Sequence, residues 1–359
     1  MSKKRVAILT SGGDCAGLNA VMRAAVLSAT ALGWEIIGIE NGTAGLLESP
    51  PRWRILKPDD FDGTVMRLGG TVLGTTNSRN PFEYKMDDGR TLDRSDELIA
   101  ALKELGVDSV IGIGGDGSFA ILDKLVKKGD LKFVGVPKTI DNDVGLTDFS
   151  VGFDTAVSVA TEALDRLQPT AASHDRVMLL EVMGRDAGHI AVAAGIAGGA
   201  DVILIPEIPY TIENIASKIT EVKESGRNFA LVIVSEAVRT PDGRKHEVVY
   251  HGGETRYGGI AEYLGVQIAN ATGSETRVTV LGHVQRGAAP TYNDRLLASA
   301  MGAKAVEVLA RGDHGRMVAW QNRDVTDVAI EDAIKECYTV ATDGVLVRTA
   351  RALGISFGD

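Results

Sequence analysis

The chain has 359 residues, of which 44% are hydrophobic and 24% are charged, and its formal net charge is −10. This composition is typical of a globular protein of about two domains. The acidic balance argues against broad nucleic-acid binding, which needs a basic face. No apolar run is long enough for a membrane span or a signal-peptide core. Two cysteines, Cys15 and Cys337, cannot form a disulfide framework, so we expect a cytoplasmic protein.

The first half of the chain alternates short apolar runs with helix-forming segments. We expect strands at residues 6–9, 35–39, 109–113 and 131–136, and helices at 21–32, 95–105 and 119–127. Two of these strands lead into glycine loops, at residues 10–20 and 114–118. A strand, a glycine loop and a helix together present backbone N–H groups to phosphate. The loops fit neither the Walker pattern nor GxGxxG, so an ordinary tight turn remains an alternative.

The strand at residues 131–136 ends at Pro137, which cannot continue a regular ladder. Lys138, Thr139, Asp141 and Asp143 follow, so a cation, a hydroxyl and two carboxylates lie within six residues. If the segment is extended, Asp141 and Asp143 share a face, and their like charges need a metal, a cation or a raised pKa. This chemistry favours a catalytic segment, although an Asp/Asn-rich turn is the simpler alternative.

The second half continues the alternation. We expect strands at residues 176–183, 201–205, 228–234 and 277–281, and helices at 152–167, 186–197, 211–225, 260–271, 293–310 and 325–338. Such alternation predicts an α/β protein with doubly wound parallel sheets, which bind ligands at the carboxyl ends of their strands. Polar residues stand at several of those ends, including Arg185, Glu236 and His283. The presence of such polar residues at so many strand ends is hard to explain as coincidence.

Taken in order, the motifs resemble those of the phosphofructokinase family from about residue 5 to about residue 315. They are Gly12-Gly13-Asp14, Gly114-Gly115-Asp116-Gly117-Ser118, Pro137 to Asp143, Met183-Gly184-Arg185, Glu236, and Gly282-His283-Val284-Gln285-Arg286-Gly287. The resemblance implies two Rossmann-like domains with the active site in the cleft between them. We expect one domain at residues 1–140 plus about 252–305, another at about 141–251 plus about 306–320, and a C-terminal extension at about 321–359.

The resemblance also implies an activity, the Mg²⁺-dependent transfer of a phosphoryl group to the 1-hydroxyl of fructose 6-phosphate. Asp141 would take the hydroxyl proton and Asp143 would be its neighbouring catalytic carboxylate. Thr139 and Arg185 would contact the transferred group, and Lys138 a terminal phosphate. Asp116 would hold Mg²⁺. The residues that would bind the phosphoryl donor are Gly12, Gly13, Arg79, Gly115, Gly117 and Ser118.

The sugar phosphate would be held by two groups of residues. By the same resemblance, Met183, Gly184 and Glu236 would contact the sugar. The 6-phosphate would be bound by Arg176, Arg277, His283 and Arg286. Arginine forks suit phosphate oxygens and supply the local positive charge that the acidic chain needs. In the family, Arg176 and Arg277 complete a neighbour's site, so we expect a homo-oligomer, either a dimer or a tetramer.

Two positions give opposite indications of the phosphoryl donor. Gly117 resembles ATP-using members of the family, because a side chain there would crowd the α-phosphate. Lys138 resembles pyrophosphate-using members. We give Gly117 more weight and expect ATP, with pyrophosphate as the alternative and a non-catalytic sugar-phosphate or nucleotide binding protein as a second one. Leu27 and Ser225 replace cations of regulated bacterial members, so we expect weak or absent control by nucleotide or phosphoenolpyruvate effectors.

Overall fold

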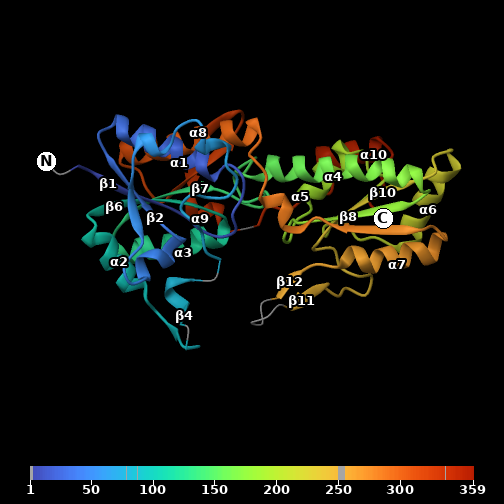
Figure 1. Ribbon diagram of the computed structural model, residues 1–359, viewed down its shortest axis with the longest axis horizontal. Coiled ribbons are helices and arrows are strands. Elements are labelled where there is room, and N and C mark those ends of the chain that lie inside the picture. Colours follow the sequence, from blue (N-terminus) through green and yellow to red (C-terminus); the bar gives the residue numbers. More distant parts are fainter. Residues whose placement is uncertain (1–2, 78, 87, 250–254, 336) are drawn as a thin grey trace. The chain divides into compact units, whose positions relative to one another are not determined.

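Strands and helices alternate along the chain in the computed structural model, which describes residues 3–77, 79–86, 88–249, 255–335 and 337–359 (Figure 1). The chain divides into two units, each built around its own sheet. The first comprises Met1–Asp154 and Arg286–Cys337, and the second Thr155–Gln285 and Tyr338–Asp359. Within the described part of the chain, no helix has both the length and the apolar composition that a membrane crossing needs.

The sheet of the first unit contains seven strands among the described residues. Their order is β15 (Asp324–Ala329), β14 (Arg316–Gln321), β7 (Lys132–Pro137), β6 (Val107–Gly114), β1 (Arg5–Thr10), β2 (Glu35–Ile39) and β3 (Trp53–Leu56). The strands from β14 to β2 are parallel, and β15 and β3 pair antiparallel at the two edges. The central strands β1, β6 and β7 are almost wholly buried, as expected for parallel strands covered on both faces.

Helices cover both faces of this first sheet. The long helices α1 (Leu18–Ala31) and α8 (Tyr292–Arg311) pack against each other on one side (Figure 1). The helices α2 (Ser95–Glu104), α3 (Asp116–Gly129) and α9 (Ile330–Ala333) contribute to one core on the other side. The short helix η1 (Gly42–Leu47) lies between β2 and β3. The long connection from β3 to α2 holds further short elements, which are η2 (Pro58–Asp60), η3 (Val65–Arg67), η4 (Pro81–Glu83), β4 (Tyr84–Lys85) and β5 (Thr91–Leu92).

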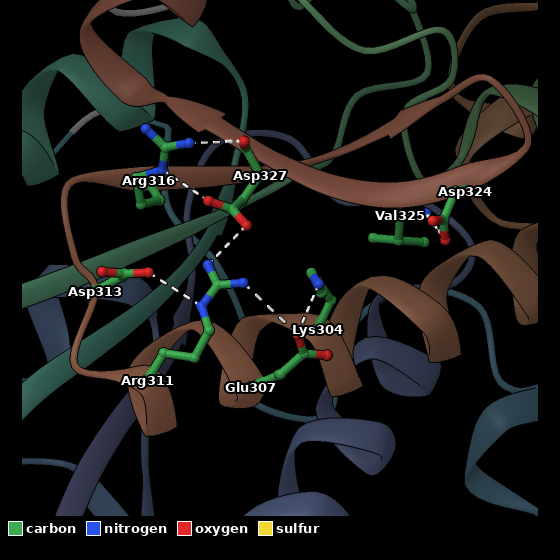
Figure 2. Close-up of polar contacts among 8 residues, drawn as sticks. All are labelled: Lys304, Glu307, Arg311, Asp313, Arg316, Asp324, Val325 and Asp327. Atoms are coloured by element: carbon green, nitrogen blue, oxygen red, sulfur yellow. Dashed lines mark hydrogen bonds and ion pairs between the residues drawn. The ribbon is translucent and has the colours of Figure 1, made fainter.

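Ion pairs fasten the β14–β15 hairpin to the end of α8 (Figure 2). Asp327 of β15 accepts from Arg311 Nη2 at 2.8 Å through Oδ1 and from Arg316 Nε at 2.7 Å through Oδ2. Arg311 also reaches Asp313, with 3.0 Å between Nε and Oδ2. One carboxylate therefore joins the last turn of α8 to both strands of the hairpin.

The sheet of the second unit consists, among the described residues, of four parallel strands. Their order is β13 (Thr276–Val280), β8 (Val177–Val182), β10 (Ala230–Ser235) and β9 (Val202–Leu204). On one face α6 (Ile212–Glu224) and α7 (Ile260–Thr272) share a core with the strands. On the other face α4 (Phe153–Ser173) and α5 (His189–Ala197) pack against the sheet, and α10 (Val345–Ala352) packs on α5. The hairpin of β11 (Glu247–Val249) and β12 (Thr255–Tyr257) precedes α7, and η5 (Gly282–Arg286) follows β13.

Most expected elements are present, with shifted ends. The predicted helix at residues 325–338 is wrong, because residues 324–329 form β15 and only Ile330–Ala333 is helical. The β-branched residues Val325, Thr326 and Val328 suit a strand paired to β14. The strands β3 and β14 were not predicted. The helix expected from residue 186 begins instead at His189, after a loop.

The two units divide the chain differently from the predicted boundaries. Residues 252–285 were assigned to the first domain, but β13 pairs with β8 of the second sheet and α7 shares its core. Residues 306–337 belong to the first unit because β14 extends its sheet beside β7. The final residues are no separate extension. They return to the second unit, where Ser356 forms a bridge with Val202.

Candidate active site

Three neighbouring strands of the first unit deliver the predicted donor and catalytic loops to one edge of their sheet. The strands are β1, β6 and β7, and their ends are joined by backbone hydrogen bonds. Ser11 N donates to Ile113 O at 2.9 Å, and Lys138 N donates to Gly114 O at 2.9 Å. The loops that begin at Ser11, Gly114 and Lys138 therefore start side by side, as expected at the carboxyl ends of parallel strands.

Gly12 lies where these loops meet and has a φ of +83°, in the left-handed region. A Cβ on Gly12 would lie 3.2 Å from Ser118 Oγ and 3.3 Å from Lys138 Nζ. A neighbouring segment also contacts it, because Gly12 N donates to Thr76 O at 3.1 Å. Gly12 therefore needs glycine both for its backbone conformation and for the space around it. Gly13 is crowded as well, since a Cβ there would lie 2.9 Å from Arg286 Nη1.

Lys138 braces the first glycine loop. Its side chain is buried, with 3% of the residue exposed. Its Nζ donates to Ser11 O at 2.8 Å and to Gly13 O at 2.5 Å. Burial lowers the pKa of Lys138 below its usual value. A cation in this position holds the loop carbonyls together and leaves positive charge beside the loop N–H groups.

The second glycine loop forms the start of α3. Gly115 is its N-cap, and Asp116, Gly117 and Ser118 form its first turn. The N–H groups of a first turn have no partner within the helix, which suits an anion. A Cβ on Gly117 would have nothing within 4 Å. The space beside Gly117 is therefore open, and the protein itself does not require glycine there.

The residues that follow β7, from Lys138 to Asp143, form a buried turn. Asp141 is 5% exposed and Asp143 1% exposed. Thr139 Oγ1 donates to Asp141 Oδ2 at 3.1 Å, and the Oδ1 of Asn142 accepts from Ser150 N at 2.8 Å. Asn142 has a φ of +54°, which asparagine tolerates better than most residues. Asp143 Oδ2 also accepts from Cys337 Sγ at 3.8 Å. The turn therefore fixes both carboxylates.

In the second unit, the predicted sugar residues gather at the carboxyl ends of β8, β10 and β13. We call Met183 to Gly188 the arginine loop. Met183 N donates to Gln285 Oε1 at 2.8 Å. Glu236 Oε1 accepts from Gly184 N at 3.3 Å and from Arg185 N at 3.1 Å. Arg185 has a φ of +52°, an unusual conformation for a residue with a side chain. The loop is therefore held in shape by side chains from the neighbouring strand ends.

Known proteins that are similar to this chain share one family name. The family model described as Phosphofructokinase matches residues 5–309. The chain is 57% identical to ATP-dependent 6-phosphofructokinase 1 of Synechocystis sp., over 99% of each chain. It is 56% identical to ATP-dependent 6-phosphofructokinase 1 of Nostoc sp., over 100% of each chain. This chain belongs to the phosphofructokinase family. A solved phosphofructokinase of Pichia pastoris in the T-state superposes with a TM-score of 0.81 at 27% identity, covering 99% of this chain and 37% of that one.

Membership of the phosphofructokinase family implies a metal-dependent phosphoryl transfer, and the residues of the first unit fit Mg²⁺ in one particular way. Among the described residues there is no group of three or more His, Cys, Asp or Glu side chains that could hold a metal. Mg²⁺ is commonly bound by one or two carboxylates together with substrate phosphates. The carboxylate of Asp116, in the first turn of α3, matches that arrangement. A magnesium ion would therefore arrive with the donor.

The four residues expected to bind the 6-phosphate in this phosphofructokinase separate into three places. Arg176 and Arg277 share one carboxylate, since Arg176 Nη2 lies 3.0 Å from Glu275 Oε1 and Arg277 is paired with the same oxygen. Arg176 comes just before β8 and Arg277 lies at the start of β13, whereas His283 follows the end of β13. Arg286, in the first unit, donates from Nη1 to Asp14 O at 3.0 Å, beside the glycine loop.

The structure shows side-chain contacts of Arg79 and Gln285 that the sequence did not indicate. The Arg79 guanidinium, expected at the donor, donates to the Tyr84 hydroxyl at 2.5 Å. Gln285 was not named as a site residue, yet it is 1% exposed and fixes Met183. Its position in the sequence between His283 and Arg286 could have identified it as a site residue. Glu207, which accepts from Gly188 N at 3.0 Å, left no such signal in the sequence.

Proposed function

We propose that this member of the phosphofructokinase family is an ATP-dependent 6-phosphofructokinase, which converts fructose 6-phosphate to fructose 1,6-bisphosphate. The observation that carries the proposal is the combination at the ends of β1, β6 and β7. Two glycine loops suited to a polyphosphate lie beside a buried turn with a hydroxyl and two carboxylates. The names of the cyanobacterial relatives support the same activity.

The acceptor chemistry is assigned to the turn after β7. The 1-hydroxyl oxygen of the sugar attacks the terminal phosphorus of ATP, and the bond from that phosphorus to the bridging oxygen breaks. The hydroxyl proton passes to the Asp141 carboxylate, and ADP leaves. Thr139 donates to Asp141 Oδ2 and so orients the base. Phosphoryl transfer depends mainly on such positioning and on charge stabilisation.

The donor is assigned to the two glycine loops. Backbone N–H groups at Gly13 and in the first turn of α3 would bind phosphate oxygens, and Gly12, whose own N–H donates to Thr76 O, would shape the loop beside them. Lys138 adds a cation that is already fixed against the loop. Mg²⁺, held by Asp116 and the donor phosphates, would neutralise charge on the phosphate oxygens. Arg79 stays a proposed donor contact, because a guanidinium bonded to a tyrosine hydroxyl can exchange that partner for a phosphate.

The sugar phosphate is assigned to a further set of residues. Met183, Gly184 and Glu236 would contact the sugar, and Arg185 would stabilise charge on the transferred group. His283 and Arg286 would bind the 6-phosphate. Arg176 and Arg277 belong to the opposite end of their sheet. Arg176 precedes Met183 by seven residues along an extended strand, a separation of about 23 Å. This separation supports a homo-oligomer in which these two arginines complete a neighbour's site.

The donor is tested by parallel assays of fructose 1,6-bisphosphate formation with Mg²⁺ and either ATP or pyrophosphate. The open space beside Gly117 favours ATP, whereas Lys138 is the feature that favours pyrophosphate. We expect turnover with ATP that exceeds turnover with pyrophosphate by about 100-fold or more. Activity with pyrophosphate alone would assign the alternative donor. Inactivity with both donors, at retained ligand binding, would reduce the protein to a sugar-phosphate or nucleotide binding protein. A cytoplasmic location remains part of the proposal.

A further inference from the structure

The backbone of the arginine loop is held by hydrogen bonds to side chains outside the loop, and its Arg185 side chain lies beside a carboxylate of the same loop. Gln285, Glu236 and Glu207 accept hydrogen bonds from loop N–H groups. The Arg185 side chain itself is 52% exposed. A long, half-exposed arginine has many rotamers, and a rigid backbone does not choose among them. A neighbouring carboxylate that is itself held in place narrows the directions that the guanidinium can take.

Asp186 is the neighbouring group with suitable geometry, because its two carboxylate oxygens point to different partners. Its Oδ2 lies 4.0 Å from Arg185 Nε. Its Oδ1 accepts from the Tyr257 hydroxyl at 2.7 Å. Asp186 is itself 58% exposed, so an ion pair between it and Arg185 would be weak and mobile without further support. The hydroxyl of Tyr257 supplies that support by occupying one oxygen and thereby fixing the direction of the other.

Tyr257 is in turn fixed from behind. It is the last residue of β12 and pairs across the hairpin with Glu247 of β11. Lys245 Nζ donates to the Tyr257 hydroxyl at 2.7 Å and lies 5.0 Å from the centre of its ring. The hydroxyl thus accepts from a cation and donates to an anion, and such chains of hydrogen bonds strengthen one another. Burial and the hydrogen bond to Asp186 raise the pKa of Tyr257, so the hydroxyl keeps its proton.

We propose that Tyr257 is a positioning residue for phosphoryl transfer, which acts through Asp186 to direct the Arg185 guanidinium. The inference rests on the proposed function, in which Arg185 stabilises charge on the transferred group. Lys245, Tyr257 and Asp186 form one relay from the base of the β11–β12 hairpin to the arginine loop. The hairpin is thereby a support for the catalytic machinery of the second unit.

The relay predicts a specific kinetic change in Tyr257→Phe, which removes the hydroxyl and keeps the ring. We expect kcat to fall about five- to tenfold while KM for fructose 6-phosphate changes by less than about twofold, since a misdirected guanidinium weakens the transition state more than the bound substrate. Tyr263→Phe is the matched control. Tyr263 lies on α7, its ring packs near His246, and it is not one of the three residues of the relay, so the kcat of Tyr263→Phe should stay at the wild-type value.

A double variant tests whether Tyr257 acts through Asp186. Asp186→Asn should lower kcat, and Tyr257→Phe in that background should lower it no further, because residues in one relay are not additive. Multiplied losses in the double variant would overturn the inference. A Tyr257→Phe protein with a lower unfolding temperature and an unchanged kcat would also overturn it, because the hydroxyl would then have a structural role only.

A second measurement does not depend on activity. Phenylglyoxal modifies arginine side chains, and peptide mass analysis reads its reaction at Arg185. We expect Arg185 to react about threefold faster or more in Tyr257→Phe than in the wild type or in Tyr263→Phe, because its counter-ion is no longer held. Equal rates in all three proteins would overturn the inference. If the wild type phosphorylates no fructose 6-phosphate with either donor, the proposed function fails, and the modification rates still decide the role of Tyr257.

Discussion

At the scale of single residues, Lys138 combines two roles that the sequence could not separate. From the sequence it was a cation available for a terminal phosphate. In the structure its ammonium group also donates to two carbonyls of the first glycine loop. Such a brace serves ATP and pyrophosphate equally well, because it shapes the loop before a donor binds. Lys138 is therefore a weaker indicator of the donor than a direct phosphate contact would be.

Asp141 is the residue on which the proposed chemistry depends most. In Asp141→Ser we expect kcat to fall by about 10² to 10⁴, the usual contribution of a general base, with little change in KM for either substrate. Steady-state assays check this. Asp130→Asn is a control for loss of one negative charge, because Asp130 is an exposed C-cap of α3 with a φ of +53°, where asparagine is well tolerated. A kcat within tenfold of the wild type in Asp141→Ser would contradict the assignment.

Gly117 gives a test of the donor that does not disturb the fold. A Cβ on Gly117 would meet no protein atom within 4 Å, so we expect Gly117→Asp to change the unfolding temperature by no more than about 2 °C. A carboxylate beside the donor phosphates should nevertheless lower kcat/KM for ATP by about 100-fold or more, because juxtaposed like charges cost several kcal/mol. Gly117→Ala separates steric from charge effects and should be intermediate. An unchanged kcat/KM for ATP in Gly117→Asp would show that the donor phosphates do not bind beside this residue.

At the scale of elements, continuous apolar runs predicted the strands that lie in the middle of a parallel sheet. The runs that became β1, β6 and β7 are continuous and apolar because both faces are covered. The strands β3 and β15 are edge strands with exposed or half-exposed residues, so their periodicity is weak. The segment from Val325 to Ala329 is short and partly exposed, and its pairing with β14 completes the strand. Edge strands depend on partners that are distant in sequence.

The β14–β15 hairpin provides a prediction for this edge. In Asp327→Asn the carboxylate that accepts from Arg311 and Arg316 is lost, and we expect the free energy of unfolding to fall by about 1–3 kcal/mol. Denaturant unfolding measures it. Asp324→Asn is the matched control in the same hairpin, since Asp324 accepts only from the nearby Val325 N in Figure 2 and should have a small effect.

The same carboxylate gives a pH dependence. Burial alone would raise the pKa of Asp327, but hydrogen bonds from Arg311 and Arg316 outweigh it and hold the pKa below its usual value. Asp327 therefore contributes its full stabilisation above the unfolded-state pKa of about 3.9 and loses it as the pH falls through the lower folded-state pKa. The difference in unfolding free energy between wild type and Asp327→Asn should be constant near pH 7 and shrink in acid. A difference that grows in acid would contradict this.

At the scale of the whole molecule, the order of motifs in the sequence predicted two α/β units but not where the chain crosses between them. The crossings fall within α4 and η5, and the chain crosses once more after Cys337. Crossings inside or beside regular elements leave no Pro- or Ser-rich linker to detect. The predicted site residues lie at strand ends in each unit, because motif positions depend on local sequence. The supports of the arginine loop, Glu207 and Tyr257, come from distant segments and could not be read from the sequence.

The assembly of the protein decides whether one chain holds a complete site. Arg176 lies about 23 Å along β8 from the arginine loop, and Glu275 pairs with both Arg176 and Arg277 at that end of the sheet. If they complete a neighbour's site, two inactive variants can repair each other. Arg277→Ala lacks the arginine and Asp141→Ser lacks the base. In a mixed dimer, the site with an intact Asp141 receives an intact Arg277 from its neighbour.

Co-expressed Asp141→Ser and Arg277→Ala subunits with different affinity tags should therefore regain activity. Random pairing makes half of the dimers mixed, each with one intact site, so the pool should recover about a quarter of wild-type kcat per subunit. If the arginines served their own subunit, each site of a mixed dimer would carry one defect and no activity would return. A mixture of Asp141→Ser and Asp143→Asn is the control that must stay inactive, because both residues belong to the same turn of the first unit. Recovery in the first mixture alone would establish that the working enzyme is an oligomer.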